Sequence, residues 1–193
     1  MTQWLSHRMV ERGIIKEEEQ ELYQFGICNG MILLLNVVTA LVIGLLTEQL
    51  AVVAVFTLSF MVLRSYTGGY HSDSRIFCYL GSNLVLLVPV YTQAVFYKTS
   101  LAWLLAVLLV SAGIIFLLSP MHSKNRKLDK EEQKHFGRKA RLIAALELAV
   151  LGILWHAGQI PYAYAVYTGI CITALFMLVG KAQLWIQSHT ENG

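Results

Sequence analysis

The sequence predicts an all-α integral membrane protein with about six transmembrane helices. Of its 193 residues, 56% are hydrophobic and only 14% are charged, and the mean hydropathy is +0.56. A soluble domain of this size is more polar. The apolar residues form six runs, at residues 28–46, 50–63, 76–97, 100–119, 142–157 and 160–180. A helix needs about 20 apolar residues to cross the hydrocarbon core of a bilayer, and most of these runs approach that length.

Two of the six runs are irregular. The second run, residues 50–63, is short, and the fifth contains Glu147. Each is expected to be a short span or a re-entrant segment, so the number of spans lies between four and six. In the third run, Pro89 lacks a backbone N–H group and predicts a kink.

The basic residues favour six spans and orient them. With six spans, fourteen of the fifteen Lys and Arg residues fall on the side that holds both termini, and only Lys98 falls on the other. The positive-inside rule therefore places both termini, the interval 64–78 and the basic segment 120–141 in the cytoplasm. The short connections on the outer side, at residues 47–49, 98–99 and 158–159, predict antiparallel neighbouring helices.

The chain divides into an interfacial segment (1–26), a polytopic membrane domain (27–181) and a cytoplasmic tail (182–193). Residues 1–26 lack the apolar core of a secretory leader. We expect one short helix that ends at Gly13, and a second at residues 16–25. The apolar residues of the first helix are spaced along one face, as in helices that lie in the plane of the membrane surface: Trp4, Leu5, Met9 and Val10.

The polar interval at residues 64–78, RSYTGGYHSDSRIFC, separates the second and third runs. It contains His71 and, seven residues later, Cys78. A thiolate can attack a carbonyl carbon while an imidazole takes and returns the proton. The pair therefore suggests the dyad of a cysteine protease at a membrane face. On these residues alone, an unrelated loop histidine and helix cysteine remain the alternative.

His71 and Cys78 can meet only if the backbone turns between them. On one unbroken helix, residues i and i+7 lie roughly 10 Å apart along the axis, beyond hydrogen-bond reach. Gly68 and Gly69 permit backbone conformations that other residues avoid. Because Ser72 and Asp73 are favourable N-caps, we expect a helix to begin just after them. Its N-terminal end would hold Cys78, where the helix dipole favours a thiolate.

Three further polar residues could serve this site. Arg64 could hold a substrate carboxylate or carbonyl, or it could anchor a helix end at the membrane surface. Glu147 is a carboxylate at membrane depth, which makes it a functional hypothesis; it could orient His71, bind a substrate amine or pair with Arg64. Ser82 follows Cys78 by one helical turn, and it could donate to an oxyanion or bond to its own helix backbone.

The basic segment 120–141 contains eight Lys and Arg residues, among them Lys124, Arg126 and Lys127. It could bind acidic lipid headgroups or an acidic peptide, or it could be an ordinary cytoplasmic anchor. The three cysteines form neither an even framework nor a C-x-x-C pair. We therefore expect no structural disulfide and no metal or other cofactor. No nucleic-acid partner is expected.

These features together resemble the accessory gene regulator protein B (AgrB) family of membrane peptidases from Gram-positive bacteria. The resemblance covers essentially the whole chain. It rests on Arg64, on GGYH at residues 68–71, on Cys78, and on SPMHSKNRKL at residues 119–128, which opens the lysine-rich segment. The order of six apolar runs matches as well.

The resemblance implies a membrane-embedded cysteine endopeptidase for quorum sensing. Such enzymes process a precursor peptide with an amphipathic N-terminal helix, a short central segment and an acidic C-terminal tail. Cys78 would be the nucleophile and His71 the general base, and the peptide would remain as a thioester on Cys78 until it cyclises. Arg64 and Gly69 match positions that the family needs for activity. The expected partners are the precursor, membrane lipid and a second copy of the chain.

Three alternatives remain on sequence grounds. A peptide exporter or transport component without proteolytic chemistry is compatible with six spans and Glu147, although the chain has no P-loop. A metal-dependent intramembrane enzyme would use His71, Cys78, His122 or His135, but no H-E-x-x-H or comparable spacing supports it. A membrane scaffold would leave the polar interval 64–78 unexplained.

Overall fold

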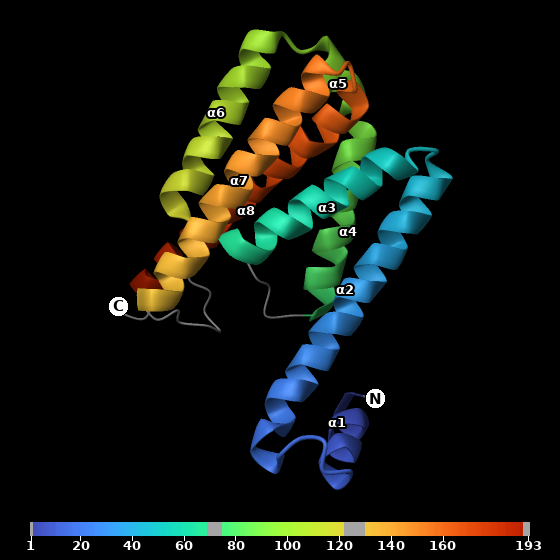
Figure 1. Ribbon diagram of the computed structural model, residues 1–193, viewed down its shortest axis with the longest axis vertical. Coiled ribbons are helices and arrows are strands. Elements are labelled where there is room, and N and C mark those ends of the chain that lie inside the picture. The colour runs from blue at the N-terminus through green and yellow to red at the C-terminus, as the bar shows by residue number, and fades with distance from the viewer. Residues whose placement is uncertain (1, 69–74, 122–129, 191–193) are drawn as a thin grey trace. The chain divides into compact units, whose positions relative to one another are not determined.

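The computed structural model describes residues 2–68, 75–121 and 130–190, and every regular element in these ranges is helical (Figure 1). The all-α fold class is therefore confirmed. The elements in chain order are α1 (Thr2–Glu11), the 3₁₀ turn η1 (Glu17–Glu19), α2 (Gln20–Leu46), α3 (Leu50–Thr67), α4 (Arg75–Tyr91), α5 (Gln93–Lys98), α6 (Leu101–Leu118), α7 (Lys130–His156) and α8 (Ile160–Thr190).

The chain forms two compact units, Met1–Thr39 and Ala40–Gly193. In the first unit, α1 ends before Gly13, which has a φ of +66°, in agreement with the predicted stop. The predicted separate helix at residues 16–25 is wrong, because η1 leads directly into α2, which continues without a break to Leu46. No proline interrupts this stretch, so the helix that starts at Gln20 propagates into the apolar run.

Four helical stretches are long and apolar enough to cross a membrane: residues 17–46, 50–67, 101–118 and 160–186. They indicate a membrane protein. The second run forms the continuous 18-residue helix α3. The apolar part of α4, Tyr79–Tyr91, is shorter. The fifth run is the apolar half of α7, whose N-terminal half is charged, and α8 extends beyond residue 180 to Thr190. The count of six spans stays a prediction.

The third apolar run forms two helices, α4 and α5, instead of the single span expected over residues 76–97. The break lies at Thr92, three residues after Pro89. Because the helix stops there, the hydroxyl of Tyr164 in α8 can donate to the carbonyl oxygen of Pro89 at 3.0 Å, and it lies 2.6 Å from the Thr92 hydroxyl. A side chain 72 residues away in sequence thus stabilises the break.

Helix α8 lies at the centre of the second unit and contacts α3, α4, α5, α6 and α7. Figure 1 shows α6, α7 and α8 running side by side, and α3 packs against α7 and α8. One buried cluster surrounds Phe56 and Tyr164, and a second surrounds Leu63 and Met177. In lipid, such helices are held together by close packing and interhelical hydrogen bonds more than by the hydrophobic effect.

Short connections join α2 to α3, α5 to α6 and α7 to α8, at residues 47–49, 99–100 and 157–159. They agree with the predicted outer connections to within one residue. Gly44 allows the first of these turns to close tightly, because a Cβ atom there would lie 2.8 Å from the Cα atom of Leu50.

Candidate functional site

The interval 64–78 begins at the C-terminal end of α3, where the chain leaves the helix through Gly68. Gly68 has a φ of +71°, a conformation that favours glycine, as the sequence suggested. The guanidinium of Arg64, one turn earlier, donates from Nη1 to the carbonyl oxygen of Gly68 at 2.7 Å. Its central carbon lies 5.1 Å from the ring centroid of Phe176 in α8. Arg64 therefore holds the protein's own backbone at the start of this interval.

A second contact on the end of α3 comes from the chain that follows α6. The backbone N–H of Met121 donates to the carbonyl oxygen of Thr67 at 2.9 Å. The last four carbonyl groups of a helix have no partner within it, and Thr67 is fully buried. Met121 thus supplies a hydrogen bond that neither α3 nor solvent provides.

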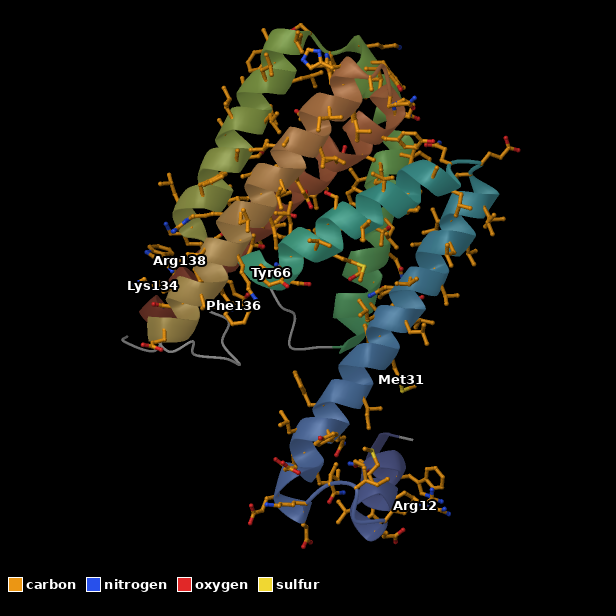
Figure 2. All side chains as sticks on the ribbon, in the orientation of Figure 1. Arg12, Met31, Tyr66, Lys134, Phe136 and Arg138 are labelled. Carbon is orange, nitrogen blue, oxygen red and sulfur yellow. The ribbon has the colours of Figure 1, made fainter. Side chains whose placement is uncertain are left out.

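Helix α7 supports the same place. Gly137 packs on Pro120, and the ring of Phe136 lies 6.4 Å from the ring of Tyr66. Figure 2 shows Phe136 on the side of α7 that faces Tyr66, with Lys134 and Arg138 on the other side. We call this set of contacts the α3 junction; it comprises Tyr66–Gly68, Ser119–Met121, Phe136 and Gly137.

Cys78 is the fourth residue of α4, which begins at Arg75. It therefore lies near the N-terminal end of α4 as the structure describes that helix. His71 and the two N-cap candidates, Ser72 and Asp73, precede Arg75 in sequence and lie outside the described residues. Ser82 lies one turn after Cys78 and is half-buried.

Several predicted residues cannot be placed. The side chain of Cys78 lies outside the described part of the structure, as do His71, Gly69 and the three basic residues Lys124, Arg126 and Lys127. In the described part of the chain, no group of three or more His, Cys, Asp or Glu side chains could hold a metal ion.

Glu147 receives a hydrogen bond from a residue that the sequence did not single out. Its Oε2 atom accepts a bond of 2.7 Å from the hydroxyl of Ser59 in α3. Ser59 is buried where α8 comes close, because a Cβ atom on Gly169 would lie 2.5 Å from its Oγ atom. The sequence carried one signal: Ser59 is a polar residue in helical register with the buried Val52, Phe56 and Leu63.

A comparison with protein families matches residues 1–178 of the chain to the accessory gene regulator B family. The chain belongs to the AgrB family. The match includes every element that forms the α3 junction and the segment that carries His71 and Cys78.

The sequence did not predict that Phe136, Gly137 and Met121 lie at the end of α3, because the residues that they contact there are distant in sequence.

Curated relatives agree with membership of the AgrB family. An AgrB-like protein 2 of Clostridium perfringens strain 13 is 24% identical over 131 residues, which is 65% of this chain and 61% of the relative. Accessory gene regulator protein B of Staphylococcus intermedius is 26% identical over 121 residues, 63% of this chain and 62% of the relative. The chain thus spans about three fifths of the length of the curated relatives it matches. No solved structure matches the chain.

Proposed function

We propose that this AgrB family member is a membrane-embedded cysteine endopeptidase that releases the C-terminal tail of an autoinducing peptide precursor and promotes its cyclisation. The observation that carries the proposal is the place of Cys78 in a chain that matches the family along almost its whole length. Cys78 is the fourth residue of α4, and His71 precedes that helix in sequence. The proposal requires the backbone to turn between the two residues, because on one unbroken helix they would lie about 10 Å apart along the axis.

Tail release proceeds by acyl transfer. His71 takes the proton of the Cys78 thiol, and the thiolate attacks the carbonyl carbon of the peptide bond that precedes the tail. The C–N bond breaks, and His71 gives its proton to the departing amine. The products are the free tail and a thioester between the peptide and Cys78. In this proposal the positive end of α4 favours the thiolate, and backbone N–H groups at the start of the helix stabilise the developing oxyanion.

Ring closure is a second acyl transfer, in which the peptide leaves Cys78. A cysteine or serine side chain of the bound peptide attacks the thioester carbonyl, and Cys78 leaves as a thiolate that recovers a proton through His71. The product is a thiolactone or a lactone ring. The reaction needs water to be kept away from the thioester, and a site at the membrane surface suits this requirement.

The proposed setting is the cell membrane of a Gram-positive bacterium, with both termini and the site on the cytoplasmic side. The precursor lies on the membrane through its amphipathic helix, and its acidic tail is attracted to the basic segment 120–141, which includes Lys124, Arg126 and Lys127. The enzyme acts as a homodimer. Arg64 and Gly68 shape the start of the catalytic loop, while Gly69, Ser82 and Glu147 are assigned supporting roles.

The test uses the full chain in lipid vesicles with a synthetic peptide that has an amphipathic helix, a central cysteine and an acidic tail. Intact mass spectrometry compares the wild type with Cys78→Ala, and with Cys171→Ala as a matched cysteine control. We expect the wild type and Cys171→Ala to release the tail and to show a peptide adduct, and Cys78→Ala to do neither. Equal cleavage by all three proteins would contradict the proposal. If the peptide stays full length with all three proteins, the proposal is also contradicted, and a transport role is favoured.

A further inference from the structure

The α3 junction contains none of the reacting groups, yet it holds Gly68, the last described residue before His71. We propose that Phe136, Gly137 and Met121 are positioning residues for the proposed reaction. They fix the C-terminal end of α3, and through it the point where the chain begins the segment that carries the general base. The inference rests on the proposed function.

The first step of the argument is the bond between Met121 and Thr67. Thr67 is fully buried, so water cannot replace the Met121 N–H at the Thr67 carbonyl oxygen. Moving the chain after α6 away from α3 would leave a buried carbonyl group without a partner, which is unfavourable. The bond therefore keeps the end of α3 and the chain after α6 at a fixed separation.

The second step is the tight fit of Gly68 against Met121. A Cβ atom on Gly68 would lie 2.6 Å from the carbonyl oxygen of Met121. The two backbones are thus in direct contact, one residue along from the Thr67 carbonyl group that accepts the Met121 hydrogen bond. Arg64 binds the Gly68 carbonyl oxygen from within α3, and Met121 binds the adjacent Thr67 and packs against Gly68, so the position of Gly68 depends on both.

The third step connects this contact to α7. Gly137 is buried, and a Cβ atom there would lie 3.0 Å from Cδ of Pro120 and 3.5 Å from the carbonyl oxygen of Ser119. A larger side chain at Gly137 would therefore push the residues just before Met121. Phe136, its neighbour on α7, reaches α3 directly through the ring of Tyr66.

The consequence is a specific sensitivity of the active site to α7. A displacement of about 1 Å in a group that must be aligned for reaction can lower the rate by about a hundredfold. A bulky residue at Gly137 should shift Gly68 and the segment after it, without removing any group that touches the peptide. The expected signature is a fall in kcat with little change in KM.

The first experiment needs no peptide substrate. The full chain in vesicles is treated with iodoacetamide at neutral pH, and the modification rate of each cysteine is followed by mass spectrometry. Gly137→Val is compared with Gly152→Val, a matched change in the same helix where a Cβ atom meets nothing within 4 Å. His71→Ala defines the rate of a Cys78 thiol without its base, and the half-buried Cys171 of α8 reports on the packing of the bundle.

We expect Gly137→Val to slow the modification of Cys78 by about tenfold, towards the rate of His71→Ala, because a thiol without its base is mostly protonated at this pH. Cys171 should react at the wild-type rate in both valine variants, and Gly152→Val should leave Cys78 unchanged. In the tail-release assay, Gly137→Val should lower kcat by about a hundredfold with KM nearly unchanged. Equal behaviour of Gly137→Val and Gly152→Val would overturn the inference.

Milder variants decide the matter if Gly137→Val disturbs the whole fold and Cys171 also reacts faster. Gly137→Ala and Phe136→Leu should then slow Cys78 with Cys171 unchanged, and Phe136→Tyr, which keeps the ring, should behave as the wild type. If Cys78 reacts at the wild-type rate in both Gly137→Ala and Phe136→Leu, the positioning role is refuted. Failure of the proposed function would give a different result. The wild type would release no tail, and His71→Ala would not change the modification rate of Cys78. The positioning role would then be refuted as well.

Discussion

The hydroxyl of Ser59 in α3 donates a hydrogen bond of 2.7 Å to Oε2 of Glu147 in α7, across 88 residues of sequence. Each helix brings one half of a polar contact into a bundle whose buried side chains are mostly apolar. Leaving either half unpaired there is unfavourable, because neither lipid nor the surrounding aliphatic side chains can replace the bond. The contact therefore holds α3, which ends at the α3 junction, against α7, which supports it.

Replacing Ser59 with alanine is expected to lower the free energy of unfolding by about 1–2 kcal/mol, because Glu147 loses its donor in a buried setting. Ser65→Ala is the matched control in the same helix: Ser65 is exposed and bonds to the carbonyl oxygen of Met61, so its loss should cost little. Denaturant titration in detergent micelles measures both. If the two variants have equal free energies of unfolding, the Ser59 hydrogen bond does not stabilise the protein as predicted.

Replacing Gly169 with alanine should destabilise the protein by about 1–3 kcal/mol, because the new methyl group would lie 2.5 Å from Oγ of Ser59. The double variant with Ser59→Ala removes that atom and leaves the Ser59 Cβ atom, at 3.2 Å, as the nearest neighbour. We expect the two changes together to cost less than the sum of the single ones. A strictly additive result in the same denaturant titrations would argue against this packing; Gly152→Ala, in open space, serves as the control.

Gly68→Ala should impair the protein more than its backbone conformation alone explains. Gly13→Ala gives the cost of a positive φ without a clash, because Gly13 has a φ of +66° with nothing within 4 Å; Gly68 combines a φ of +71° with a ψ of −155°. We expect about 1–2 kcal/mol of destabilisation at Gly13 and about 3 kcal/mol at Gly68, where the Met121 carbonyl oxygen stands in the way. Tail release should be lost only in Gly68→Ala. If both substitutions have similar effects on stability and tail release, the close contact with Met121 does not contribute to either.

Arg64→Lys separates two readings of this arginine. If Arg64 acts by holding the Gly68 carbonyl oxygen, lysine should lower kcat by about tenfold with KM nearly constant, because an ammonium group lacks the directed N–H donors of the guanidinium. If Arg64 binds the substrate, KM should rise instead. Arg141→Lys is the matched control, since Arg141 also donates to a backbone carbonyl oxygen, that of Phe116, away from Gly68. Steady-state kinetics of tail release decide between them.

Much of the fold follows from local patterns in the sequence. The apolar runs predicted the helices of the bundle, because a segment at membrane depth must satisfy its own backbone hydrogen bonds. The short polar connections predicted which consecutive helices are antiparallel neighbours. The positive φ of Gly68 follows from the conformational freedom of glycine. These are properties of a few consecutive residues.

The remaining features depend on partners far away in sequence. Pro89 predicted a distortion, but the break at Thr92 is accompanied by the Tyr164 hydroxyl from α8. Glu147 was recognised as an unfavourable group at membrane depth, but its bond to Ser59 arises only when α3 and α7 pack together. Arg64 reads equally well as a substrate ligand or a helix-end anchor until the carbonyl oxygen of Gly68 is seen beside it.

Helix α7 runs without interruption from Gly137, which touches Pro120, to Glu147, which touches Ser59. At 1.5 Å and about 100° per residue, these two points are separated by about 15 Å and by a fixed rotation about the helix axis. One inserted residue between them would turn one point away by about 100°, and seven would restore the rotation but add about 10 Å. This stretch of α7 should therefore accept many changes of side chain and no change of length.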